Sequence, residues 1–110
     1  MAARKQSLPL FHAPEEESAS CASLLRVLAD ETRLAVVEGL LQGPRCVSEI
    51  NEGLGVEPSL LSHHLRVLRD AGIVNAKRQG KQVFYELTRQ VQGRKQGQAI
   101  DLGCCMITFD

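Results

Sequence analysis

Apolar residues recur every three to four positions between residues 21 and 72, which predicts a series of amphipathic helices. Four helices are expected, and they begin at or just after Cys21, Asp30, Cys46 and Pro58. Asp30 is a preferred N-cap, and Pro58 fits a first helical turn because its ring fixes φ in the helical range. Gly43-Pro44 is expected to end the second helix, and Gly72 is expected to end the fourth.

After residue 72 the pattern becomes typical of strands. Segments 73–77 and 82–87 are predicted strands, and the glycine-containing stretch 78–81 between them predicts a hairpin turn. The polar segment 89–98, RQVQGRKQGQ, is expected to be a loop. The final IDLGCCMITF is expected to be a strand, because Gly disfavours a helix while Ile, Thr and Phe favour strands. The predicted fold is α+β, mainly α, with a two-stranded β-wing and a strand-like C-terminal tail.

Length and composition suit one small globular domain of 110 residues, 44% of them hydrophobic. We expect a flexible lead-in at 1–18, a helical and winged domain at 19–88, and a basic loop with a cysteine-containing strand at 89–110. No apolar run approaches the roughly 20 residues needed to span a bilayer, and a signal peptide is not expected. A cytoplasmic location is therefore expected, where the four cysteines would be ligands, redox sensors or core residues rather than a disulfide framework.

The formal net charge is zero, but the charges are segregated along the chain. Residues 58–98 carry eight basic and two acidic side chains, so eight minus two gives +6. Residues 1–57 carry five basic and nine acidic side chains, a balance of −4, and two aspartates nearer the C-terminus supply the remaining −2. A local positive field of this kind attracts a polyanion such as DNA even when the whole molecule is neutral.

Two helices joined by a glycine turn and followed by a basic ribbon form the outline of a winged helix-turn-helix. The fourth helix is expected to bury Leu61, Leu65 and Leu68 and to present a polar face to the major groove, while cations on the ribbon reach phosphates or the minor groove. The residues predicted to contact DNA are Ser59, Ser62, His63, Arg66, Lys77, Arg78 and Lys81. His64 falls on the buried side, where we expect a packed, hydrogen-bonded histidine.

The stretch from residue 28 to residue 88, more than half of the chain, carries a recognisable pattern. Its most specific pieces are LADETRLAVVEGLL, SLLSHHLRVLRDAGIV and KRQGKQVFYEL. Together these pieces resemble the ArsR/SmtB family of bacterial winged-helix repressors. The resemblance implies a homodimer that binds an imperfect palindrome in double-stranded operator DNA without a cofactor and represses transcription. An inducer, often a metal or metalloid ion, would then release it.

Members of this family place their inducer sites in several unrelated positions. One type needs acidic residues and histidines on a C-terminal helix, which this sequence replaces with a polar loop and a strand-like tail. A second type has two cysteines in a stretch similar to RCVSEI here. Cys46 matches the first of them, but Ser48 stands at the second. Cys46 is therefore either a helix-capping residue or one member of a site completed from elsewhere.

Cys104 and Cys105 are adjacent near the C-terminus. Neighbouring side chains of a regular strand point to opposite faces, so two such thiols do not readily share one ion. In one alternative, Gly103 allows a bulge or turn that brings both sulfurs to one side. In a second, each thiol pairs with a different cysteine, and in a third the two oxidise to a readily reduced vicinal disulfide. They could also simply pack within an apolar strand.

The thiols point to soft ions, because soft thiolate ligands select soft metals. Three sulfurs suit As(III) or Sb(III), and thiolate-rich sites also suit Cd(II), Pb(II), Hg(II) or Cu(I). The leading ligand set is Cys104 and Cys105 with Cys21, since the N-terminal helix lies at the dimer interface in the family that the chain resembles; Cys46 is a further candidate. The predicted function is a repressor released from its operator when such an ion, As(III) or Sb(III) foremost, binds these thiolates.

Two other functions remain open. A thiol redox-sensing repressor of the same fold would release DNA on oxidation and recover with a reductant. A thiol-exchange or metal-delivery protein is disfavoured, because the sequence has no Cys-x-x-Cys motif, no Ser/His/Asp or Cys/His constellation and no glycine-rich nucleotide loop. An enzyme is therefore not expected.

Overall fold

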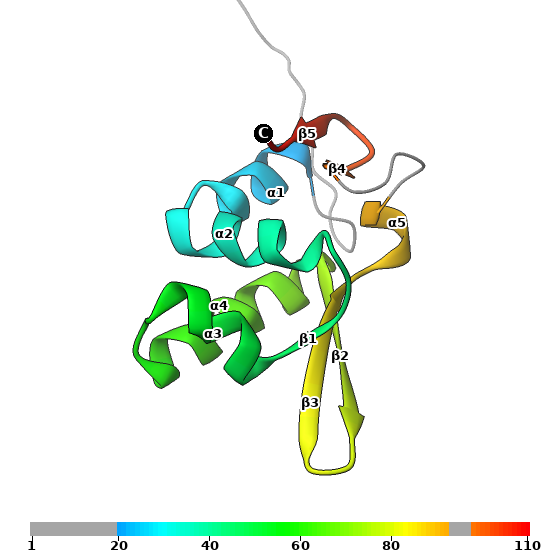
Figure 1. Cartoon of the computed structure of the whole chain (residues 1–110). Coiled ribbons are helices and arrows are strands. Elements are labelled where there is room, and N and C mark those ends of the chain that lie inside the picture. Colours follow the sequence, from blue (N-terminus) through cyan, green and yellow to red (C-terminus); the bar gives the residue numbers. More distant parts are fainter. Residues whose placement is uncertain (1–19, 93–97) are drawn as a thin grey trace, which may run out of the picture.

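The computed structural model describes residues 20–92 and 98–110, so the predicted lead-in at 1–18 lies outside it. The helices gather into one body, the β2–β3 ribbon projects from it, and a small C-terminal hairpin lies beside the first helix (Figure 1). Within the described residues, no helix is long and apolar enough to cross a membrane.

The four predicted helices are present as α1 (Cys21–Leu28), α2 (Glu31–Leu40), α3 (Val47–Leu54) and α4 (Pro58–Asp70). Oδ1 of Asp30 accepts a hydrogen bond from the backbone N–H of Arg33 at 3.0 Å, which confirms the predicted cap of α2. Gly72 follows α4 with a φ of 78°, a left-handed conformation that glycine adopts without a Cβ clash, and α4 ends there as predicted.

A three-stranded antiparallel sheet has the strand order β1-β3-β2. Strands β2 (Val74–Gln79) and β3 (Gln82–Leu87) form the predicted wing, and their last pair is Gln79 with Gln82. The turn is therefore only Gly80-Lys81, shorter than the predicted 78–81. Strand β1 (Arg45–Cys46) pairs with β3 and is not predicted from sequence, because two residues are too few to show an alternating pattern.

The C-terminal part departs from the prediction in two ways. The segment expected to be a loop begins with one helical turn, α5 (Arg89–Gln92), which is anchored by burial of Val91 and is too short to show a helical period. The tail predicted as one strand is a hairpin of β4 (Ala99–Asp101) and β5 (Met106–Thr108). A turn at Gly103, where φ is 89°, reverses the chain between the two strands.

The hydrophobic core joins the helices to the start of the wing and to the C-terminal hairpin. Its most deeply buried side chains are Val36, Val37, Leu61, Leu68, Ile73, Val74 and Ile100. Each fully buried side chain of this size stabilises the fold by roughly 1.5–3 kcal/mol. Ile100 and Phe109 come from the tail, and their burial holds the hairpin against the rest of the domain.

Candidate nucleic-acid interface and thiol cluster

Helix α4 divides into a buried and an exposed face, as its sequence predicts. The buried residues are Leu61, His64, Leu65 and Leu68. The exposed residues include the four predicted to contact DNA, which are Ser59, Ser62, His63 and Arg66. Their helical spacing places two hydroxyls, an imidazole and a guanidinium on one side of the helix. The hydroxyl of Ser62, the imidazole of His63 and the guanidinium of Arg66 can donate hydrogen bonds to base edges and phosphates.

The N-terminus of α4 is capped by Glu57, which the sequence interpretation missed. Its Oε1 accepts from the backbone N–H groups of Ser59 at 3.0 Å and Leu60 at 3.2 Å, and also from the Ser59 hydroxyl. These hydrogen bonds hold the pKa of Glu57 below its ordinary value, and the bond from the Ser59 hydroxyl has the largest effect. An acidic residue directly before Pro58 was the available signal, since helix N-termini favour negative charge. In this arrangement the Ser59 hydroxyl donates its proton to Glu57 and has no second proton to donate to DNA.

His64 is packed and hydrogen-bonded, as predicted. Only 7% of its surface is exposed, and its Nδ1 lies 3.0 Å from Nη1 of Arg33 on α2. The adjacent His63 is exposed. The two neighbouring histidines therefore face different environments, and of the two only His63 is exposed to solvent.

The wing carries the other three residues predicted to contact DNA, Lys77, Arg78 and Lys81, and all three are exposed. Nζ of Lys77 lies 2.9 Å from Oε2 of Glu86 on the neighbouring strand, so this cation is already paired. Arg78 and Lys81 form no ion pair with another described residue. They are the wing cations most available to a phosphate.

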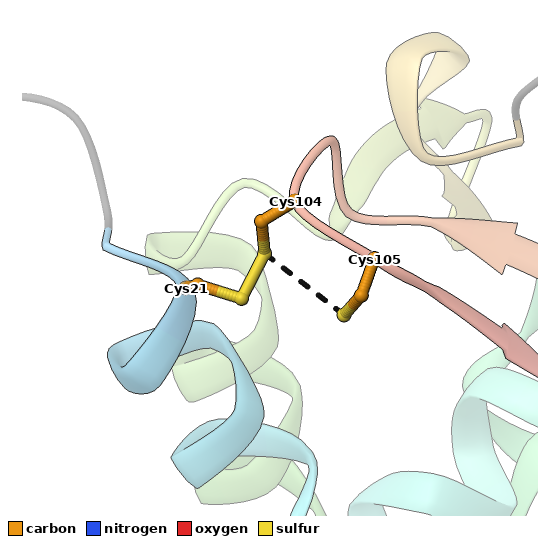
Figure 2. Close-up of side chains that lie close together, drawn as sticks. All are labelled: Cys21, Cys104 and Cys105. Carbon is orange, nitrogen blue, oxygen red and sulfur yellow. Dashed lines mark hydrogen bonds between the residues drawn. A yellow bond between two sulfur atoms is a disulfide. The ribbon is translucent and has the colours of Figure 1, made fainter.

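Three of the four cysteines meet where α1 contacts the C-terminal hairpin. Cys21 is the first residue of α1, whereas Cys104 and Cys105 lie in the turn between β4 and β5. Cys21 and Cys104 form a disulfide, and Cys105 lies beside them (Figure 2). The Sγ atom of Cys105 is 3.9 Å from Sγ of Cys104. The three sulfur atoms lie within 4.8 Å of one another. Cys104 is exposed and the other two are partly exposed, so small reagents can reach the cluster.

The two adjacent thiols share one side because they lie in a turn instead of a regular strand. The N–H of Gly103 donates to Oδ1 of Asp101 at 2.8 Å, and the N–H of Leu102 donates to the carbonyl of Cys105 at 2.9 Å. The structure thus combines the turn that Gly103 allows with a pairing of Cys104 and Cys21. This disulfide departs from the expectation of reduced thiols, and it forms because core packing brings the hairpin against α1.

Cys46 lies elsewhere, as a buried free cysteine at the start of α3. Its backbone N–H donates to Oε1 of Glu49 at 3.0 Å, which holds the pKa of Glu49 below its ordinary value. Its Sγ lies 3.2 Å from Oγ of Ser48. Cys46 is not among the three clustered sulfurs, and the structure places it in the capping role that the sequence offered as one alternative.

Comparisons with known proteins agree with this fold. The family model described as "Bacterial regulatory protein, arsR family" matches residues 30–76. The HTH-type transcriptional repressor SmtB of Mycobacterium tuberculosis is 41% identical over 81 residues, which are 72% of this chain and 60% of SmtB. The biofilm growth-associated repressor of Agrobacterium fabrum is 39% identical over 82 residues, 74% of this chain and 70% of that protein.

Among solved structures, the transcriptional repressor BigR from Xylella fastidiosa matches with a TM-score of 0.59 and 41% identity. The match covers 62% of this chain and 69% of BigR. The chain spans 60% of the length of the first curated relatives. The shared sequence, the exposed recognition helix and the wing together show that the chain belongs to the ArsR/SmtB family of winged-helix transcriptional regulators.

Proposed function

We propose that this chain is a DNA-binding transcriptional repressor that leaves its operator when a soft metal or metalloid ion binds Cys21, Cys104 and Cys105. As(III) and Sb(III) are the favoured inducers. The repressor acts as a cytoplasmic homodimer on double-stranded DNA and has no enzymatic activity. The observation that carries the proposal is the meeting of three sulfur atoms within 4.8 Å of one another.

The donor set fits an ion that takes three sulfur ligands. Sulfur ligands bound to one ion by bonds of about 2.3 Å must lie less than about 4 Å from one another. The Sγ atoms of Cys104 and Cys105 are already 3.9 Å apart. Reduction of the Cys21–Cys104 disulfide by a dithiol frees the thiols of Cys21 and Cys104, and Cys105 is already a free thiol. No carboxylate or imidazole within the described residues joins the group, which favours three-coordinate As(III) or Sb(III) over four-coordinate Zn(II).

The position of the cluster supports a regulatory role. Cys21 and Cys104 are 83 residues apart in sequence, so an ion held between them ties the start of α1 to the C-terminal hairpin. Helix α1 packs on α2, and α2 packs on α4. In a homodimer, a shift of α1 changes the spacing of two recognition helices that must match half-sites about 34 Å apart. Coupling of this kind is commonly about 1–3 kcal/mol, roughly 5- to 150-fold in affinity.

A redox switch is the second candidate, and the Cys21–Cys104 disulfide favours it. Oxidation of these two thiols forms one S–S bond and gives up two protons and two electrons. A peroxide can accept them and become two molecules of water. The disulfide then links α1 to the hairpin covalently, as the bound ion would do through its sulfur ligands. A dithiol reductant breaks this disulfide again.

The test uses fluorescence anisotropy of the reduced chain on labelled DNA from its own promoter, under anaerobic conditions. We expect near-stoichiometric arsenite to lower the anisotropy as the protein leaves the DNA. Cys104→Ser should bind DNA like the parent and lose the response to arsenite, whereas the matched control Cys46→Ser should retain it. Release of Cys104→Ser at the same arsenite concentration as the parent would refute the proposed ligand set.

Cys105→Ser separates the two candidates, because a three-sulfur ion site needs Cys105 and the Cys21–Cys104 disulfide does not. If the inducer is an ion, this variant loses the response to arsenite. If the switch is the disulfide, the variant still leaves DNA when peroxide is added, and dithiothreitol restores binding. If the parent chain binds its promoter DNA neither reduced nor oxidised, the proposed repressor function is refuted.

A further inference from the structure

Leu60 is a large apolar side chain left open in the first turn of α4. It is 46% exposed, whereas its neighbour Leu61 is fully buried. In the helix it lies three residues before His63, and it flanks the polar face of α4 that the sequence predicts to contact DNA. An exposed leucine at this position neither stabilises the core nor offers a hydrogen bond to DNA.

The surroundings of Leu60 suit a base edge better than a phosphate. The backbone N–H groups of Ser59 and Leu60 both donate to the carboxylate of Glu57, and Pro58 has no N–H. The first turn of α4 therefore has few free donors for a phosphate, and the Glu57 carboxylate repels one. The same hydrogen bonds hold the first turn in a fixed conformation, so the position of Leu60 is well defined.

The chemistry of the major groove gives such a side chain one specific partner. N-terminal residues of a recognition helix meet base edges in the groove. Among the four bases, only thymine presents a 5-methyl group there, and apolar side chains recognise it by direct contact.

We infer that Leu60 reads a thymine in the operator by packing against its 5-methyl group. The inference rests on the proposed function, and it adds an apolar contact to the polar ones offered by Ser62, His63 and Arg66. Burial of one methyl group in this contact is worth about fourfold in affinity. Leu60 is thus a specificity-determining residue.

The experiment removes the Leu60 side chain and the thymine 5-methyl group separately. The chain and its Leu60→Ala variant are titrated onto two labelled duplexes of the same promoter sequence, one natural and one with deoxyuridine in place of every thymidine. Uracil differs from thymine only by the missing methyl group. We expect the parent to bind the natural duplex about fourfold more tightly for each methyl group that it touches. Leu60→Ala should reduce this preference and bind the uracil duplex about as tightly as the parent does.

Met106→Ala is the matched control, because Met106 is 51% exposed but lies on β5 of the C-terminal hairpin. It should keep the parent's preference for thymine, and circular dichroism checks that both variants are folded. An unchanged preference in Leu60→Ala, or no preference in the parent, would overturn the inference. These outcomes require a parent that binds promoter DNA, whereas absence of binding by the parent would overturn the proposed function.

Discussion

The guanidinium of Arg33 on α2 donates a hydrogen bond from Nη1 to Nδ1 of the buried His64 on α4, over 3.0 Å. Arginine carries donors only, so Nδ1 of His64 accepts this hydrogen bond. The Nε of the same guanidinium donates to the carbonyl oxygen of Val27 at 2.6 Å, in the last turn of α1. One side chain therefore links the helix that carries Cys21 to the recognition helix.

Replacement of Arg33 should destabilise the domain. Arg33→Met leaves the Val27 carbonyl and Nδ1 of His64 without their donor, and hydrogen bonds to a charged group contribute about 1.5–3 kcal/mol. We expect a loss of about this size in the free energy of unfolding, measured by urea denaturation. Arg26→Met is the control, because Arg26 is an exposed arginine on α1. Equal stability of Arg33→Met and Arg26→Met would contradict the role of this hydrogen-bond pair.

The disulfide should stabilise the oxidised chain. Cys21 and Cys104 are 83 residues apart in sequence, and a cross-link that closes a long loop restricts the unfolded chain. We expect reduction with dithiothreitol to lower the free energy of unfolding by about 2–4 kcal/mol. Cys21→Ser should abolish the difference between oxidised and reduced protein, while Cys46→Ser should leave it intact. Identical urea midpoints for the parent with and without reductant would count against the disulfide.

The cap of α2 should contribute stability that depends on pH. The backbone N–H of Arg33 holds the pKa of Asp30 below its ordinary 3.8, and the positive charge of Arg33 acts in the same direction. Because the folded-state pKa is lowered, this contribution is fully present above about pH 3.8 and is lost as the pH falls through the folded-state pKa. Asp30→Ala should cost about 1 kcal/mol at pH 7.

Urea denaturation of the parent and Asp30→Ala at a series of pH values provides the measurement. The difference between the two proteins should stay constant from pH 7 to pH 5 and shrink below about pH 3.8. A difference that is unchanged throughout the acid range would show that the ionised carboxylate is not what stabilises the helix.

The wing should contribute to DNA binding through its pairing with phosphates. Lys81 is exposed at the turn and forms no ion pair with another described residue, unlike Lys77. Lys81→Ala should weaken binding to promoter DNA and to unrelated DNA alike. It should also lower the slope of log affinity against log salt concentration by about 0.9 for each phosphate that the variant no longer neutralises.

Anisotropy titrations at several salt concentrations give this slope. Arg26→Ala removes the same charge from an exposed position on α1, so its slope should match that of the parent. A Lys81→Ala slope equal to that of Arg26→Ala would place the tip of the wing away from the DNA backbone.

The main elements of this domain could be predicted from sequence because they depend on short-range patterns. Asp30 caps the helix that follows it, and Pro58 and Gly72 mark the two ends of the recognition helix. The same periodicity separates buried from exposed residues on α4. The signal failed where an element was too short to show a period, as in β1 and α5.

By itself, the sequence determined the winged-helix outline, the exposed polar face of α4 and the presence of two adjacent cysteines near the C-terminus. Only the tertiary structure decided which sulfurs meet, since Cys21 reaches Cys104 through the packing of the hairpin against α1. It also decided that Arg33 bonds His64, 31 residues away. The physical reason is the range of the interactions: caps and periodicity act within a few residues, whereas these pairings depend on how the core brings distant segments together.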